Sequence, residues 1–163
     1  GREVVPILSA FDLAQRYIGI RELAGVQSNN PLIQWWLSLC SLPVDSPDET
    51  PWCAAFVNGV AWEMRLPRSK SAAARSWLAV GVPVSMAAAT PGYDVVVLKR
   101  GEGPQPGPEV LQAPGHVGWF AGLDPSAPEQ ILVLGGNQND GVSVACYSSW
   151  SVLGIRRLWP TTS

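Results

Sequence analysis

The sequence predicts an α+β fold, with N-terminal helices packed on a mostly antiparallel β-sheet. Apolar residues recur at helical spacing in the first half of the chain, whereas the second half holds short runs rich in valine and aromatic residues. Helices that precede strands in this way are typical of α+β proteins. A length of 163 residues, 47% of them hydrophobic and 15% charged, suits one compact domain. We therefore expect a single domain over residues 1–163.

The first two predicted helices are marked by their capping residues. Ser9, with Asp12 three positions later, is typical of a capping box and starts a helix that ends before Gly19. Asn30 as the cap and Pro31 as the first helical residue start the second helix. Its apolar stripe consists of Leu32, Trp35, Trp36 and Leu39.

A third helix is expected to begin at Thr50 and Pro51, which suit the cap and the first helical position. Cys53 then lies in the first turn. The apolar residues that share its helix face are Phe56, Val57, Val60 and Met64. The thiol should therefore face the neighbouring layer of the domain. A short helical segment is expected at 72–78.

Five strands are expected after the helices. They span Asp94–Leu98, His116–Ala121, Ile131–Leu134, Val142–Tyr147 and Leu153–Leu158. The turn sequence Asn139-Asp140-Gly141 joins the third and fourth strands as a hairpin, which favours antiparallel pairing. The segment from Lys99 to Gly115 is rich in glycine and proline, and is predicted to be a surface loop that can wall a cleft.

Composition and charge argue against several classes of function. A net charge of −2, with no run of lysine or arginine, disfavours nucleic acid as a partner. No apolar run reaches the roughly 18 residues of a membrane span. The N-terminus also lacks the basic start and apolar core of a signal peptide, so we expect export by another route or a leader missing from this sequence.

The cysteine and histidine content limits the chemistry further. Cys40, Cys53 and Cys146 are an odd set that fits neither a disulfide framework nor a zinc knuckle. A single histidine, His116, is fewer than a zinc amidase generally needs. We therefore expect neither a metal nor another cofactor. Cys40 is interpreted as an inert core residue.

Cys53 and His116 form the candidate catalytic pair. A cysteine in the first turn of a helix is favoured as a thiolate by the unpaired backbone N–H groups there. His116 opens a strand and is the one imidazole available as a base. Asn137, near the end of the neighbouring strand, is predicted to hold the imidazole through its amide oxygen. The alternatives are a buried inert cysteine, a structural histidine and a turn asparagine.

Four segments, in order, resemble motifs of the CHAP-like and NlpC-type cell-wall hydrolases. They are Pro51-Trp52-Cys53-Ala54-Ala55-Phe56-Val57-Asn58, Ala74-Arg75-Ser76-Trp77-Leu78, Gly115-His116-Val117-Gly118-Trp119 and Gly135-Gly136-Asn137-Gln138. The similarity runs from about Asp48 to Trp159, which is most of the chain.

The resemblance implies a papain-like fold and hydrolysis of a peptidoglycan amide bond through a thioester. Cys53 would be the nucleophile, His116 the base and then the acid, and Asn137 the residue that orients the imidazole. Relatives differ in the third position, and Gln138 and Asn139 are nearby substitutes for Asn137.

Candidate substrate-binding residues flank these motifs. Asp48 is a candidate contact for an amine or amide of the stem peptide, although an acidic residue before a helix commonly serves as a solvated dipole partner. Trp52, Trp77 and Trp119 are candidate cleft residues, with core packing as the alternative interpretation.

Two other functions stay open from the sequence. One is a non-catalytic cell-wall binding module, and the other is a cysteine protease or glutaminase that acts on a protein substrate. The leading interpretation has peptidoglycan as the partner and the bacterial wall or periplasm as the place of action. Phage endolysin, housekeeping enzyme and antibacterial toxin with an immunity protein all fit it. We expect a monomer.

Overall fold

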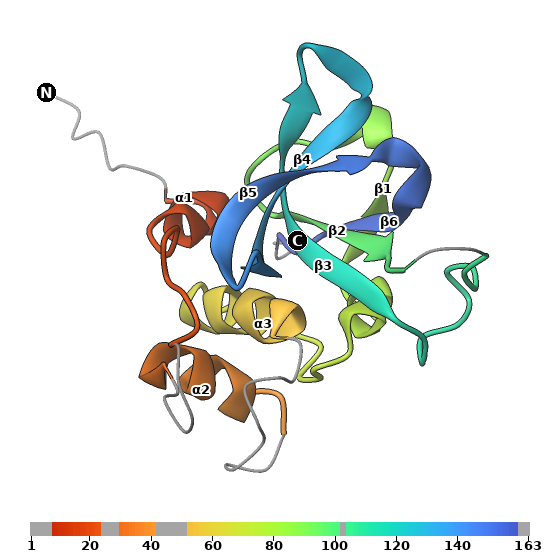
Figure 1. The fold of residues 1–163 in the computed structure, drawn as a ribbon. Helices are drawn as coiled ribbons and strands as arrows, with labels where there is room; N and C mark the ends of the chain where they lie inside the picture. The colour runs from red at the N-terminus through yellow and green to blue at the C-terminus, as the bar shows by residue number, and fades with distance from the viewer. Residues whose placement is uncertain (1–7, 24–29, 42–51, 102–103, 160–163) are drawn as a thin grey trace, which may run out of the picture.

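The computed structural model describes residues 8–23, 30–41, 52–101 and 104–159 (Figure 1). Its α-helices are α1 (Ala10–Gln15), α2 (Pro31–Ser38) and α3 (Cys53–Glu63), and its short 3₁₀ helices are η1 (Ala74–Ala79), η2 (Met86–Ala88) and η3 (Ser149–Ser151). Its strands are β1 (Val82–Val84), β2 (Asp94–Lys99), β3 (Gly115–Asp124), β4 (Ala127–Gln138), β5 (Gly141–Ser148) and β6 (Val152–Arg157).

The six strands form one sheet in the order β1-β6-β2-β3-β4-β5, and every neighbouring pair is antiparallel. The central helix α3 packs on β3 and β4, and α2 packs on the other side of α3 (Figure 1). The predicted α+β fold, with helices packed on an antiparallel sheet, is therefore confirmed.

Local sequence explains where the helices begin. The capping box of α1 is present, because Ser9 Oγ accepts from the Asp12 N–H and the Asp12 carboxylate accepts from the Ser9 N–H. Asn30 caps α2 as predicted. The predicted start of α3 at Thr50 and Pro51 is wrong. That helix begins at Cys53, with Trp52 at the cap position and no side-chain cap, while Thr50 and Pro51 lie outside the described residues.

The strands also differ from the prediction in detail. The hairpin of β4 and β5 is confirmed, but β3 and β4 extend further along the chain than their apolar centres indicated. The edge strand β1 was not predicted, since its middle residue is Pro83, which cannot donate to a ladder and is confined to edges. The helical segment expected at 72–78 is the 3₁₀ helix η1.

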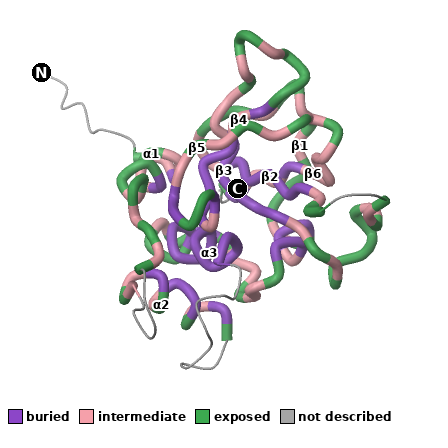
Figure 2. Tube along the Cα trace, in the orientation of Figure 1, coloured by how far each residue is buried: buried purple, intermediate pink, exposed green. Residues whose placement is uncertain are grey.

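The sheet separates two apolar clusters, and α3 is the most buried helix of the fold (Figure 2). Side chains from alternate positions of β2 and β3 go to opposite faces, as period-two alternation requires. On the α3 face they include Val95, Val97, Val117 and Trp119, and on the other face Val96, Leu98 and Phe120. Among the described residues, no helix is long and apolar enough to cross a membrane.

An ion pair between the buried Asp94 and the partly exposed Arg157 joins β2 to β6. Arg157 Nε donates to Asp94 Oδ1 at 2.8 Å and its Nη2 donates to Oδ2 at 2.9 Å, while the Asp94 side chain is 0% exposed. The Thr90 N–H also donates to this carboxylate. The pair therefore satisfies a charge that has no access to water.

Replacing Arg157 with methionine should lower the free energy of unfolding by about 3 kcal/mol, because it leaves the Asp94 carboxylate buried with the Thr90 N–H as its remaining donor. Urea unfolding followed by circular dichroism measures this loss. The double variant Arg157→Met with Asp94→Asn should recover much of it, and a single variant as stable as the original protein would contradict the argument.

Candidate active site

Cys53 is the first residue of α3, and its side chain is 1% exposed. The sulfur accepts from the N–H of Val117 on β3 and from N–H groups of the first helical turn. The N–H of Val117 is free for this contact because the β3–β4 ladder begins two residues later, at the pair Trp119–Leu134. The thiol therefore occupies the gap where β3 and β4 separate.

The thiol is protonated in the resting site. Burial raises the pKa of Cys53 above its ordinary value, and this outweighs the opposing effects of the N–H groups and of the Arg100 charge. The helix start alone predicted a thiolate, so the structure corrects that expectation. Activation of Cys53 therefore needs a base that removes its proton as it attacks.

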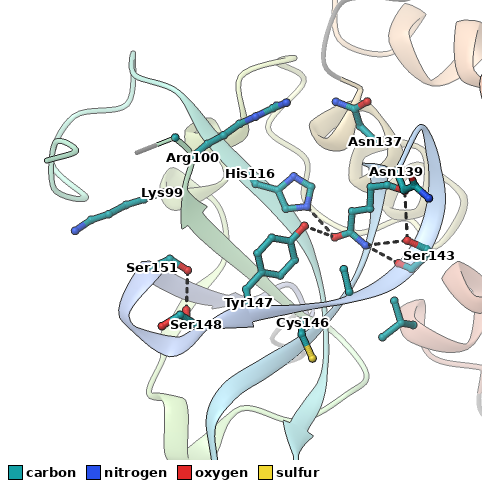
Figure 3. Close-up of a pocket in the computed structure, with 14 residues that line it drawn as sticks. Lys99, Arg100, His116, Asn137, Asn139, Ser143, Cys146, Tyr147, Ser148 and Ser151 are labelled. Carbon is teal, nitrogen blue, oxygen red and sulfur yellow. Dashed lines mark hydrogen bonds between the residues drawn. The ribbon is translucent and has the colours of Figure 1, made fainter. Parts of the chain in front are cut away.

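His116 lies near the start of β3, is 6% exposed, and belongs to a buried hydrogen-bond network. Its Nε2 lies 2.9 Å from Gln138 Oε1 (Figure 3). The amide nitrogen of Gln138 donates to the backbone carbonyls of Ser143, at 2.7 Å, and Val133, at 3.3 Å. These two carbonyls fix the direction of the amide, so the oxygen of Gln138 must face the imidazole.

This network determines the tautomer of the imidazole. An amide oxygen can only accept, so Nε2 of His116 carries the proton and Nδ1 is left with its lone pair. Burial is the largest influence on His116 and lowers its pKa, and the Gln138 hydrogen bond opposes this. His116 is therefore a neutral imidazole whose free nitrogen is a base. No hydrogen bond joins it to Cys53 within the part of the chain that the structure describes.

Tyr147 on β5 completes the network. Its hydroxyl donates to Gln138 Oε1 at 2.9 Å, and its ring lies 5.3 Å from that of His116 (Figure 3). Burial raises the pKa of Tyr147 to about 12, so the hydroxyl keeps its proton and acts as a donor. The sequence analysis did not single out Tyr147.

The contact expected of Asn137 is made by its neighbour Gln138. Strict alternation along β4 would put Asn137 on the same face as Gly135, but the β4–β5 register shifts between Gly135 and Gln138. Asn137 has φ of 57° in the left-handed region that asparagine tolerates. This bulge turns Gln138 toward His116, whereas the Asn137 side chain points away from the network (Figure 3).

The glycine pair before Asn137 allows the helix and the imidazole to approach β4 from opposite faces. A Cβ at Gly136 would lie 2.6 Å from the Trp52 ring and 2.9 Å from Phe56 Cβ, so only glycine lets the start of α3 pack this closely. A Cβ at Gly135 would lie 2.7 Å from Gln138 Oε1 and 3.2 Å from His116 Nε2. Together they let the start of α3 and the imidazole pack closely against β4.

Cys53 opens to solvent through a small apolar groove of about 360 Å³. Its lining residues are Cys53, Ala72, Ala73, Ala74, Arg100, Ala113, Pro114 and Gly115. The loop after β2 therefore forms one wall of the groove, as its composition predicted. Arg75, which is 0% exposed, holds this loop through donor contacts to the carbonyls of Pro114, Gly107 and Val110.

The other predicted site residues lie elsewhere. Trp52, Trp77 and Trp119 are each 0% exposed and pack in the core, so the structure gives them no substrate-facing surface. The candidate substrate-binding residue Asp48 lies outside the described residues. Asn139, the suggested substitute for Asn137, is an exposed turn residue that lines the cavity beside Gln138. Cys40 is a core residue whose pKa burial raises to about 12.

Replacing Gln138 with leucine should lower kcat/KM for the reaction proposed below by about 10- to 100-fold, because the imidazole loses the acceptor that fixes its tautomer. The acid limb of the pH profile should move to lower pH, since this hydrogen bond raises the pKa of His116. Ser143→Ala is the matched control, because it leaves the Ser143 carbonyl in place. An unchanged profile in Gln138→Leu would contradict a positioning role.

Comparison with known proteins gives a distant structural similarity. No family model matches the chain, and no curated protein matches it. A solved structure of NlpC1 from Trichomonas vaginalis is similar, with a TM-score of 0.44 and 14% sequence identity. The matched region covers 93% of this chain and 44% of that one. Within the described residues, no group of three or more histidine, cysteine, aspartate or glutamate side chains is arranged to hold a metal ion.

Proposed function

We propose that this protein hydrolyses an amide bond of bacterial peptidoglycan, with Cys53 as the nucleophile and His116 as the base. The observation that carries the proposal is the network around Gln138, which holds a neutral imidazole with a free nitrogen. A purely structural histidine gains nothing from an unprotonated Nδ1. The sulfur of Cys53 accepts from the N–H of Val117, the residue that follows His116 on β3, which supports pairing the two groups.

The reaction follows from these positions. Nδ1 of His116 takes the thiol proton while the Cys53 sulfur bonds to the amide carbon. The oxygen of the resulting tetrahedral adduct accepts from the Cys53 N–H at the helix start, which contacts the sulfur in the resting site. The carbon–nitrogen bond then breaks and the imidazolium gives its proton to the leaving amine. A water molecule, deprotonated by the same nitrogen, hydrolyses the thioester, which releases a carboxylic acid and restores the thiol.

Peptidoglycan is proposed as the substrate from the four ordered motifs that resemble CHAP-like and NlpC-type hydrolases. The structure gives two of these motifs a physical role that suits catalysis. The Cys53 motif contains the thiol and the start of α3. In the Gly135-Gly136-Asn137-Gln138 motif, the glycines let α3 and His116 pack closely on β4, the bulge lies at Asn137, and Gln138 accepts a hydrogen bond from the imidazole. A binding module needs none of these arrangements.

Product analysis tests this function against its rivals. Purified sacculi incubated with the protein should release new amino groups and equal numbers of new carboxyl groups, and the masses of the two products should add up to that of the substrate plus one water. A panel of unfolded proteins and free glutamine under the same conditions should give no products. Cleavage of the proteins but not of the sacculi would replace peptidoglycan with a protein substrate, and binding without any product would favour the binding module.

A further inference from the structure

Arg100 lies between the two hollows that meet at the candidate site. It follows the last residue of β2, and it lines both the groove that leads to Cys53 and the cavity beside His116 and Tyr147. Its side chain is exposed and extends alongside His116 in the close-up of that cavity (Figure 3). The guanidinium therefore lies on the wall of the groove that leads to the thiol.

The charge of Arg100 acts on every reactive group of the site. It lowers the pKa of Cys53, of His116 and of Tyr147, which shows that all three side chains lie within its electrostatic reach. These effects are secondary to burial for each group. The guanidinium is thus close to the reacting atoms, but it does not set their protonation by itself.

Arg100 has no acidic partner among the described residues. The ion pair found there joins Arg157 to Asp94 instead. Among the described residues, no aspartate or glutamate lines either hollow, and the second charged lining residue is Lys99. A chain with a net charge of −2 therefore presents a local positive field at its candidate site. An exposed, unpaired guanidinium beside a reactive centre has all its donors available for a ligand.

We propose that Arg100 binds a carboxylate of the substrate close to the scissile amide, so that the protein selects peptides with a free carboxylate at this position. This inference rests on the proposed function and names the substrate feature that the site selects. The planar guanidinium can hold a carboxylate with two parallel hydrogen bonds, which a lysine ammonium cannot reproduce. The carboxylate would also orient the amide carbonyl toward Cys53.

Two synthetic stem peptides that differ only in this group, one with a free carboxylate and one with a carboxamide, test the proposal. The original protein should have a kcat/KM about 10- to 100-fold higher for the carboxylate peptide, which is the usual range for a hydrogen-bonded charge pair. Arg100→Gln should lose this preference, because its kcat/KM should fall for the carboxylate peptide and stay unchanged for the carboxamide peptide. Arg100→Lys should retain part of it, and Lys99→Gln, the neighbouring cation, should retain nearly all of it.

Two results would overturn the inference. One is equal cleavage of both peptides by the original protein. The other is an equal loss on both in Arg100→Gln with a shifted pH profile, which would mean that Arg100 acts only through its field on Cys53 and His116. Calorimetric binding of the two peptides to Cys53→Ala separates this inference from the function. If Cys53→Ala binds the carboxylate peptide more tightly and adding Arg100→Gln abolishes this preference, carboxylate binding by Arg100 is supported even if the original protein cuts neither peptide.

Discussion

Replacing Cys53 with alanine should lower amine release from sacculi by at least about 10,000-fold, because no other group among the described residues lies at the start of α3 beside His116 to attack the amide. The sulfur is 1% exposed and contacts backbone N–H groups, so its removal leaves a small cavity and a free Val117 N–H. The variant should remain folded and bind substrate.

Cys40→Ala is the matched control for this loss. Cys40 is 4% exposed and donates to the carbonyl of Trp36 within the helical core, so its removal costs similar packing without touching the candidate site. It should keep kcat/KM near the original value. Comparable activity in Cys53→Ala and Cys40→Ala, each with an unchanged circular dichroism spectrum, would remove Cys53 from the mechanism.

Replacing His116 with asparagine should lower kcat/KM at pH 7 by about 1,000-fold, because the buried thiol then has no base. Burial keeps the pKa of Cys53 above its ordinary value of 9, so the thiolate in this variant comes only from loss of the proton to solvent. Its residual activity should therefore keep rising from pH 7 to pH 9.

The pH profile of the original protein should differ from that of His116→Asn. His116 acts as a base when neutral, and burial lowers its pKa below 6.5, so activity should be retained at pH 6.5 and fall only at lower pH. Stability should begin to fall at a higher pH than activity does, as the pH drops below 6.5, since the unfolded histidine binds a proton before the folded one does. Identical profiles for the two proteins would contradict the role of His116.

The fold was predictable because its signals are local. The capping box at Ser9, the cap at Asn30 and the hairpin turn after β4 each depend on a few neighbouring residues, and each is confirmed. The start of α3 was not, because Trp52 takes the cap position without any side-chain bond that a sequence pattern could indicate. Edge strand β1, with Pro83 at its centre, also gave no strand signal.

The candidate site was predictable only in part. The chemistry of a thiol and an imidazole singled out Cys53 and His116, but the partner of the imidazole depends on a bulge in β4 that shifts the face by one residue. The glycines before Asn137 indicate a turn, which is consistent with its positive φ. They do not indicate that the side chain of Gln138 would then face His116. Tyr147 on β5 and Arg100, which follows β2, reach the site only through tertiary packing.

The central claim is tested most directly by mass spectrometry of the protein quenched in acid during turnover of a defined muropeptide. Catalysis by Cys53 predicts a covalent adduct on the peptide that contains this residue, with an added mass equal to that of the carboxylic acid product less one water, and no adduct in Cys53→Ala. Turnover that proceeds without this adduct in any quench interval, or an adduct on Cys40 or Cys146, would contradict it.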